Sequence, residues 1–99
     1  MVEVRFTLHA LDEMESIADF IAKHSPRYAS AFISKMFDNA DVIKRHPRIG
    51  RMVPEIQDDT IRDLISGRYR IIYRIVSENR IDILTIHHSS REFPFSLFE

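Results

Sequence analysis

The sequence predicts an α+β protein in which a hairpin of two helices packs on one face of a mostly antiparallel sheet. Three observations indicate this class. A stretch near the start alternates apolar and polar side chains, two long stretches repeat apolar side chains at helical spacing, and three more strand-like stretches follow. The expected order is therefore β-α-α-β-β-β. One helical hairpin can cover only one face of such a sheet.

The first strand is expected over residues 2–7, VEVRFT, because apolar and polar side chains alternate there. The period then changes to that of a helix over about residues 10–24. Leu11, Met14 and Ile17 fall on one side of this helix, and acidic side chains occupy its first turns. These two patterns predict a strand followed directly by an amphipathic helix.

A short break separates this helix from a second one. Ser25 can cap a helix N-terminus, and Pro26 is accepted at the first helical position. The second helix is expected to end in the basic residues 44–46, which suit a helix C-terminus, and Pro47 prevents it from continuing. A break this short predicts that the two helices run antiparallel as a hairpin.

The segment 47–55, PRIGRMVPE, is expected to be a loop, because it holds two prolines and one of the two glycines. The remaining chain shows strand patterns separated by turn residues. The three expected strands are residues 60–65, 68–76 and 80–88, and the two turns are Ser66-Gly67 and Glu78-Asn79.

The register of the last hairpin follows from the length of its turn. With Glu78 and Asn79 as the two turn residues, Arg70 lies opposite His87 and Tyr73 lies opposite Leu84. This register divides the side chains between two faces. The core face holds Tyr69, Ile71, Tyr73, Ile75, Leu84 and Ile86, and the other face holds Arg70, Ile72, Arg74, Ile83, Thr85 and His87.

The face with Arg70 is expected to be the one that the helices do not cover, and so to be free for solvent or for a partner. Arginine is always charged, whereas histidine titrates near neutrality. The pair Arg70 and His87 on a rigid sheet is therefore suited to holding a phosphate or transferring a proton. The alternative is that the arginines lie flat over apolar neighbours with their charged ends in water.

The composition indicates a small intracellular protein. Ninety-nine residues are enough for one core, so we expect a single domain over residues 1–99. There is no cysteine, the first residues do not form a signal peptide, and no apolar run has the length of a membrane span. The five histidines form no metal-binding pattern. We expect a cytoplasmic location, no membrane contact, no metal and no other cofactor.

The charges are unevenly distributed along the chain. Residues 1–43 carry four basic and seven acidic side chains, whereas residues 44–91 carry ten basic and six acidic ones. Nine of those ten basic residues are arginine, which has a planar fork of donors for phosphate and carboxylate groups. The second half is therefore expected to recognise an anion or an acidic partner. The residues expected to contact it are Arg51, Arg62, Arg68, Arg70, Arg74 and Arg91.

Three segments together resemble the RelE/ParE superfamily of bacterial toxins, namely HPRIGRMVPE, IRDLISGRYRIIYRI and IDILTIHHSSRE. These proteins are the growth-inhibiting partners of type II toxin–antitoxin modules. The resemblance implies the same α+β fold, activity on the exposed side of the sheet and in the C-terminal segment, and a small cognate antitoxin encoded beside the toxin. A homodimer and a heterotetramer with the antitoxin both remain open.

The two branches of the superfamily imply different targets. ParE-like members bind and poison DNA gyrase, whereas RelE-like members cut mRNA on the ribosome. In the RelE-like case Arg70 matches the central arginine, and His87 or His88 would transfer protons. However, the preceding strand has Arg62 and Asp63 where RelE-like members have lysines. We therefore favour the ParE-like reading and leave open whether the chain is an enzyme.

Two further alternatives concern the role of the chain and of its C-terminus. The chain could be a degenerate toxin that retains only antitoxin binding. The tail EFPFSLFE has three phenylalanines, which are too apolar for an idle terminus. They are expected either to pack on their own core or to contact the antitoxin or a second copy, and they are Phe93, Phe95 and Phe98.

Overall fold

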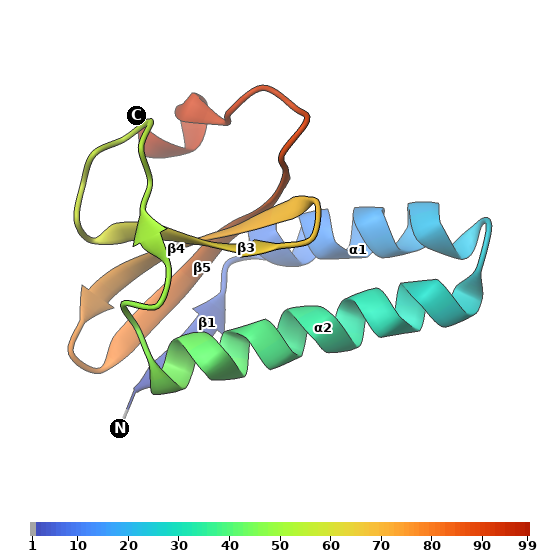
Figure 1. Cartoon of the computed structure of the whole chain (residues 1–99), viewed down its shortest axis with the longest axis horizontal. Helices are drawn as coiled ribbons and strands as arrows, with labels where there is room; N and C mark the ends of the chain where they lie inside the picture. Colours follow the sequence, from blue (N-terminus) through green and yellow to red (C-terminus); the bar gives the residue numbers. More distant parts are fainter. Residues whose placement is uncertain (1) are drawn as a thin grey trace.

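The computed structural model describes residues 2–99, and it confirms the expected order of helices and strands (Figure 1). Its elements are β1 (Glu3–Phe6), α1 (Leu8–Ala22), α2 (Pro26–Arg45), β2 (Arg51–Met52), β3 (Ile61–Ser66), β4 (Tyr69–Ser77), β5 (Arg80–His88) and a short 3-10 helix η1 (Phe95–Phe98). Two of these were not predicted. The proline-containing loop supplies the two-residue strand β2, and the tail forms η1.

Both helices begin at side-chain caps. The Thr7 hydroxyl accepts a hydrogen bond from the Ala10 amide at 3.1 Å, so α1 begins two residues earlier than the apolar period predicted. The Ser25 hydroxyl accepts from the Tyr28 amide at 3.2 Å, and Pro26 occupies the first turn of α2, as expected. Among the described residues, neither helix is both long and apolar enough to cross a membrane.

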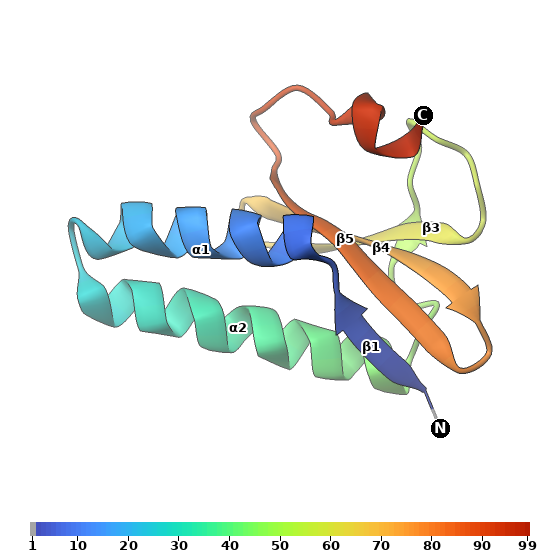
Figure 2. The same cartoon turned by 180° about the vertical axis from the view of Figure 1, so that it is seen from behind.

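The strands form one sheet in the order β1-β5-β4-β3-β2. Only β1 and β5 run parallel, and the other three pairs are antiparallel. The helical hairpin lies along one face of this sheet, and β1 lies at the sheet's edge beside the end of α2 (Figure 2). These findings confirm the predicted α+β class with a mostly antiparallel sheet.

The main core lies between the helices and the sheet. It combines Met14 and Met36 of the helices with Ile71 and Ile86 of the sheet, all at most 5 % exposed. A second, smaller core lies on the opposite face of the sheet, which we call the far face. This second core contains Val53, Ile61 and Ile72, with Ile56, Leu84, Phe93 and Phe98 packed against it.

The expectation that the far face is free for solvent or a partner was therefore wrong over the centre of the sheet. The loop before β3 and the C-terminal segment both fold over it (Figure 1). The physical reason is the number of apolar side chains that the far face carries. Ile61 and Ile72 would otherwise expose their surface to water, and the tail phenylalanines cover them.

The register of the β4–β5 hairpin was predicted correctly at both ends, where Arg70 lies opposite His87 and Ser77 lies opposite Arg80, and incorrectly by one residue between them. There Tyr73 pairs with Ile83 and not with Leu84. An extra residue in β5, Leu84, shifts the pairing by one, and an extra residue in β4, Val76, restores it before the turn. Between these two points the residues of β5 lie on the opposite face from the predicted one. Ile83 thus belongs to the main core, and Leu84 packs against the second core.

Candidate functional site

Arg70 lies near the centre of the far face and is only 8 % exposed. Its Nε atom donates to Asp63 Oδ2 at 2.6 Å, and its two terminal nitrogens donate to the Glu55 carboxylate at 2.7 and 2.9 Å. Both carboxylates accept strong, charge-assisted hydrogen bonds. The guanidinium that we expected to be free for a ligand is therefore already bound by two acidic side chains of its own chain.

Asp63 is the most deeply buried member of this cluster, with a side chain that is 0 % exposed. Besides Arg70, it accepts a hydrogen bond from Arg51 Nε at 2.9 Å. The pairing of β2 with β3 places Arg51 directly opposite Asp63. Two cations and two carboxylates thus balance each other, and we call Arg51, Glu55, Asp63 and Arg70 the ionic cluster.

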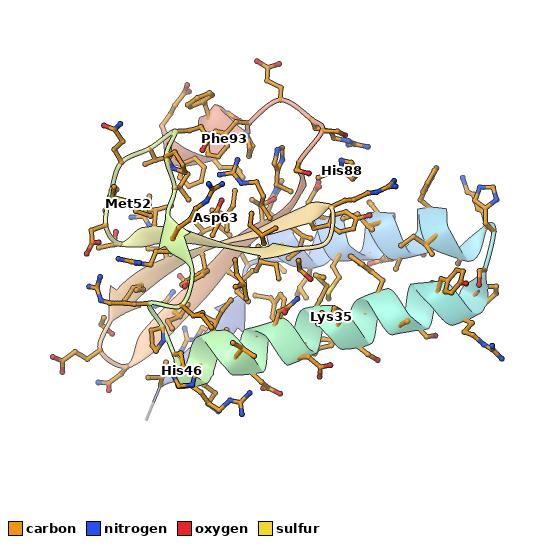
Figure 3. The ribbon with its side chains drawn as sticks, in the orientation of Figure 1. Lys35, His46, Met52, Asp63, His88 and Phe93 are labelled. Carbon is orange, nitrogen blue, oxygen red and sulfur yellow. The ribbon has the colours of Figure 1, made fainter. Side chains whose placement is uncertain are left out.

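The C-terminal segment lies over the ionic cluster (Figure 3). The Phe93 ring centre lies 5.2 Å from Arg70 Cζ, which is a cation–π contact. The same ring stacks on Phe98 at 5.6 Å and meets Phe95 edge-on at 4.8 Å. Phe93 and Phe98 therefore pack on their own chain, whereas Phe95 stays half exposed. Contact of these rings with an antitoxin or a second copy stays a prediction.

His87 lies beside Arg70 and is also only 8 % exposed. Its Nε2 atom lies 3.2 Å from the carbonyl oxygen of Arg91, to which it donates when that nitrogen carries the proton. Burial lowers the pKa of His87, and the positive charge of Arg70 acts in the same direction, while the bond to Arg91 opposes them. Burial beneath the tail thus favours the neutral form of the imidazole.

His88 points to the other face of β5, as expected for the next residue in a strand. Its Nδ1 atom lies 2.6 Å from the Ser90 hydroxyl oxygen, and its ring meets Tyr69 edge-on. Here a cavity of about 570 Å³ opens between α1 and the ends of β4 and β5. The polar side chains that line it include Glu13, Asp19, Lys23, Tyr69, His88 and Arg91.

The six predicted contact arginines are not brought together as one surface. Arg51 and Arg70 belong to the ionic cluster. Arg62 binds Asp59 at 2.6 Å and the Gly50 carbonyl at 2.9 Å.

The other three arginines are exposed and form no ion pair within residues 2–99; they are Arg68, Arg74 and Arg91. Arg68 and Arg91 lie at the same end of the sheet, since the Ser89 amide between them in space donates to the Arg68 carbonyl at 2.8 Å. Arg74 lies toward the opposite end of β4. Two of these three arginines therefore lie where β5 ends. Whether any of these arginines contacts a target stays a prediction.

Sequence reasoning missed Glu55 and Asp63 as partners of Arg70. A signal for Asp63 was present, because it occupies a position of the strand pattern IRDLIS where its neighbours on the same face are apolar. A carboxylate at such a position requires a cation nearby. Glu55 gave no signal, because it lies in an irregular loop. Among the described residues, no group of three acidic or histidine side chains gathers as a metal site.

The ionic cluster predicts loss of stability in acid. The hydrogen bond from Arg70 lowers the pKa of Glu55 to about 2, against its partial burial. A lowered pKa stabilises the fold above the pKa of the unfolded chain, and this stabilisation is lost as the pH falls toward the folded value. The free energy of unfolding should therefore decrease between about pH 4.5 and pH 2. Urea unfolding across this range should show a smaller decrease for Glu55→Gln, and an equal decrease would contradict the assignment.

Comparison with known proteins now identifies the family. Residues 4–93 match the model of a family described as the ParE toxin of type II toxin–antitoxin systems. The chain belongs to the ParE toxin family. It is thus the toxin component of a type II toxin–antitoxin system, as the resemblance implied. The fold described above agrees with this family and with the wider RelE/ParE superfamily.

Two relatives of this ParE-family toxin are themselves named as toxins. Toxin RelE2 of Caulobacter vibrioides is 28 % identical over 92 % of this chain and 99 % of its own length. Putative toxin Y4kP of Sinorhizobium fredii is 27 % identical over 92 % of each chain.

Two solved structures share the fold. A chain of the chromosomal ParDE system from P. aeruginosa has a TM-score of 0.72 and 19 % identity, covering 89 % of this chain and 96 % of its own. A chain of the RelBE2 toxin–antitoxin complex from Mycobacterium tuberculosis has a TM-score of 0.57 and 27 % identity, covering 88 % and 96 %. The family description, which is that of a toxin of toxin–antitoxin systems, supports a cognate antitoxin as a partner of this toxin.

Proposed function

We propose that this ParE-family toxin inhibits growth by binding DNA gyrase, and not by cutting RNA. The observation that carries the proposal is that Arg70 is buried and already paired with carboxylates of its own chain. Cleavage of RNA requires positive charge that is free to stabilise the phosphate as negative charge develops on it. The charge of Arg70 is instead balanced by Asp63 and Glu55, and Phe93 covers it. This arrangement supports a structural role for Arg70.

The neighbouring histidine supports the same conclusion. A general base must come within about 3 Å of the hydroxyl that it deprotonates. His87 is buried, and its Nε2 atom already contacts the carbonyl of Arg91. A substrate could reach this ring only if the C-terminal segment moved away. The centre of the far face is thus stabilised by contacts within the chain, and two exposed arginines, Arg68 and Arg91, lie at the end of the sheet where β5 ends.

We infer that gyrase contacts the end of the sheet that carries Arg68 and Arg91. Both side chains are exposed, and Lys23 lines the cavity beside them. Exposed charges of one sign increase the rate of association with an oppositely charged partner and orient it. The expected partner surface is therefore acidic. Glu13 and Asp19, which like Lys23 belong to the α1 side of the cavity, limit how far a negatively charged surface can enter.

A gyrase supercoiling assay with the purified toxin tests this proposal. We expect the toxin to block supercoiling, and we expect Arg68→Glu combined with Arg91→Glu to require at least about tenfold more protein, since each reversed contact costs on the order of 1 kcal/mol. Lys35→Glu combined with Lys44→Glu is the matched control, because both lysines are exposed on α2. This control should inhibit like the unchanged toxin.

Unimpaired supercoiling at a large excess of toxin would contradict gyrase as the target. If growth is also unaffected by induced expression, a degenerate toxin that only binds its antitoxin becomes the better description. Growth inhibition without an effect on gyrase would require another target.

Ribosome-dependent cleavage of mRNA is the second candidate, and the cavity beside His88 favours it. Tyr69, His88 and Arg91 line this cavity, so groups suited to proton transfer and phosphate binding lie close together there. The relative named RelE2 supports the same candidate. Primer extension on an abundant mRNA after induced expression distinguishes the two functions. Cuts within codons would support cleavage, and their absence together with inhibited gyrase would support binding.

A further inference from the structure

The strand β1 forms one edge of the sheet, and one side of its backbone has no strand of residues 2–99 beside it (Figure 2). The amides of Glu3 and Thr7 donate to carbonyls of the β5 side at 2.8 and 3.0 Å. Because backbone groups alternate along a strand, those of Val4 and Phe6 point away from β5. An edge of this kind can pair with a strand from another chain.

The side chains of β1 divide cleanly between the two faces. Val2, Val4 and Phe6 pack against the main core. Glu3 and Arg5 lie on the far face and form an exposed ion pair at 2.9 Å, with side chains that are 60 and 53 % exposed. The edge therefore presents an apolar row on one face, and one negative and one positive charge on the other.

We propose that two copies of this chain form a homodimer by antiparallel pairing of their β1 strands about a two-fold axis at Val4. In this arrangement Val4 lies opposite Val4 of the second copy. Glu3 then lies opposite the second copy's Arg5, and Val2 lies opposite its Phe6. The sequence VEVRF is thus complementary to itself when it is reversed. The two sheets join into one continuous sheet.

The charges of Glu3 and Arg5 also favour this register over the two adjacent registers. Only residues whose backbone groups point outward can pair, so the register changes in steps that bring Val4 opposite Phe6 or opposite Val2. The first shift places Arg5 directly opposite Arg5, and the second places Glu3 opposite Glu3. Like charges at directly opposite positions destabilise a strand pair. In the register centred on Val4, Glu3 of each copy instead lies opposite Arg5 of the other copy, so that every directly opposite pair of charged residues has opposite charges.

An apolar side chain beside β1 adds surface to this interface. Phe37 of α2 is 48 % exposed and meets the Phe6 ring edge-on at 5.5 Å. A pair of short strands by itself covers less area than a stable dimer needs, which is about 1,200 Å² or more. Pairing at β1 brings the α2 helices of the two copies toward each other. Each Phe37 side chain can then be buried between Phe6 of its own chain and the second copy. We expect a dimer of moderate affinity.

Sedimentation velocity over a range of protein concentrations tests the proposal with two charge-reversed variants. The unchanged chain is expected to dimerise as its concentration rises. Glu3→Arg alone and Arg5→Glu alone should each weaken dimerisation at least about tenfold, because like charges then face each other twice across the axis. An equimolar mixture of these two variants should form a heterodimer, because opposite charges face each other again.

The mixture separates the dimer interface from effects within one chain. Each variant loses its own exposed Glu3–Arg5 pair, and mixing cannot restore that pair. Lys35→Glu, at an exposed position in the middle of α2, is a control that should dimerise like the unchanged chain. Circular dichroism of each variant verifies that it is folded. Amide hydrogen exchange should show that Val4 and Phe6 become protected as the concentration rises.

Three results would overturn the proposal. The unchanged chain could remain monomeric at every concentration, the single variants could dimerise as well as the unchanged chain, or the mixture could stay monomeric. Protection of Val4 and Phe6 that arises only when the antitoxin is added would assign the edge to that protein and would also overturn it. The outcome is independent of gyrase, because a monomeric variant that still blocks supercoiling leaves the proposed function intact.

Discussion

Asp63→Ala is expected to lower the free energy of unfolding by about 3–5 kcal/mol, because it removes one partner of a buried ion pair. The Asp63 side chain is fully buried, and it accepts hydrogen bonds from Arg51 at 2.9 Å and from Arg70 at 2.6 Å. Without it, Arg70 stays buried with Glu55 as its remaining carboxylate. Urea unfolding followed by circular dichroism measures the difference.

Asp59→Ala is the matched control for this change. Asp59 also pairs with two arginines, Arg48 and Arg62, but its side chain is 62 % exposed. Exposed ion pairs contribute about 0–1 kcal/mol, so this variant should lose little stability. Replacing Asp63 and Arg70 together by leucine and methionine should also cost less than Asp63→Ala, because both of the most deeply buried charges are removed and Glu55, which loses Arg70, is 31 % exposed and can be solvated by water. Equal losses for Asp63→Ala and Asp59→Ala would show that the ionic cluster contributes no more than a surface pair.

Arg70→Ala is expected to lower stability for the same reason, and this affects the interpretation of a toxicity assay. This substitution leaves Asp63 buried with Arg51 as its remaining cation. A loss of toxicity could then result from unfolding and would not identify Arg70 as a contact residue. Arg68 and Arg91 are more informative positions, because both are exposed and neither forms an ion pair within the described residues.

Gly50→Ala is expected to have the second large effect, about 1–3 kcal/mol or more, because the site has no room for a methyl group. A Cβ atom at this position would lie 2.6 Å from the carbonyl oxygen of Asp63 and 2.7 Å from the hydroxyl oxygen of Tyr73. The first of these is backbone of the sheet, which cannot move easily. For a domain of this size, each kcal/mol lowers the melting temperature by about 4–8 °C.

Tyr73→Phe tests whether the tyrosine hydroxyl contributes to this tight contact. That hydroxyl donates to the Pro47 carbonyl at 2.6 Å and accepts from the Gly50 amide at 3.0 Å. Because the two residues touch, their effects should not be additive, and Gly50→Ala should cost less in the Tyr73→Phe chain. Gly67→Ala is a useful comparison, since no atom lies within 4 Å of its Cβ position and its cost arises from a φ of +58° alone. A Gly50→Ala chain as stable as the unchanged protein would refute the steric argument.

Part of the fold followed from local patterns that act over a few residues. The Ser25-Pro26 break, the two amphipathic helices and the pairing of Arg70 with His87 were all predictable. Caps and periodicity depend on neighbouring residues, and a short turn sets the first pairs of a hairpin. The prediction was wrong between Tyr73 and Ile75, because an extra residue enters β4 at Val76 and another enters β5 at Leu84, and no local signal marks either position. The two shifts cancel, so Arg70 and His87 still pair as predicted.

The sequence by itself determined the order of elements, the family resemblance and the face of the sheet on which Arg70 and His87 lie. Only the tertiary structure decided what surrounds them. Glu55 and Phe93 come from segments without a regular period, so their contacts with Arg70 depend on how the whole chain folds back over the sheet. Burial of charge is favourable only when partners from distant segments meet, and that is a property of the assembled fold.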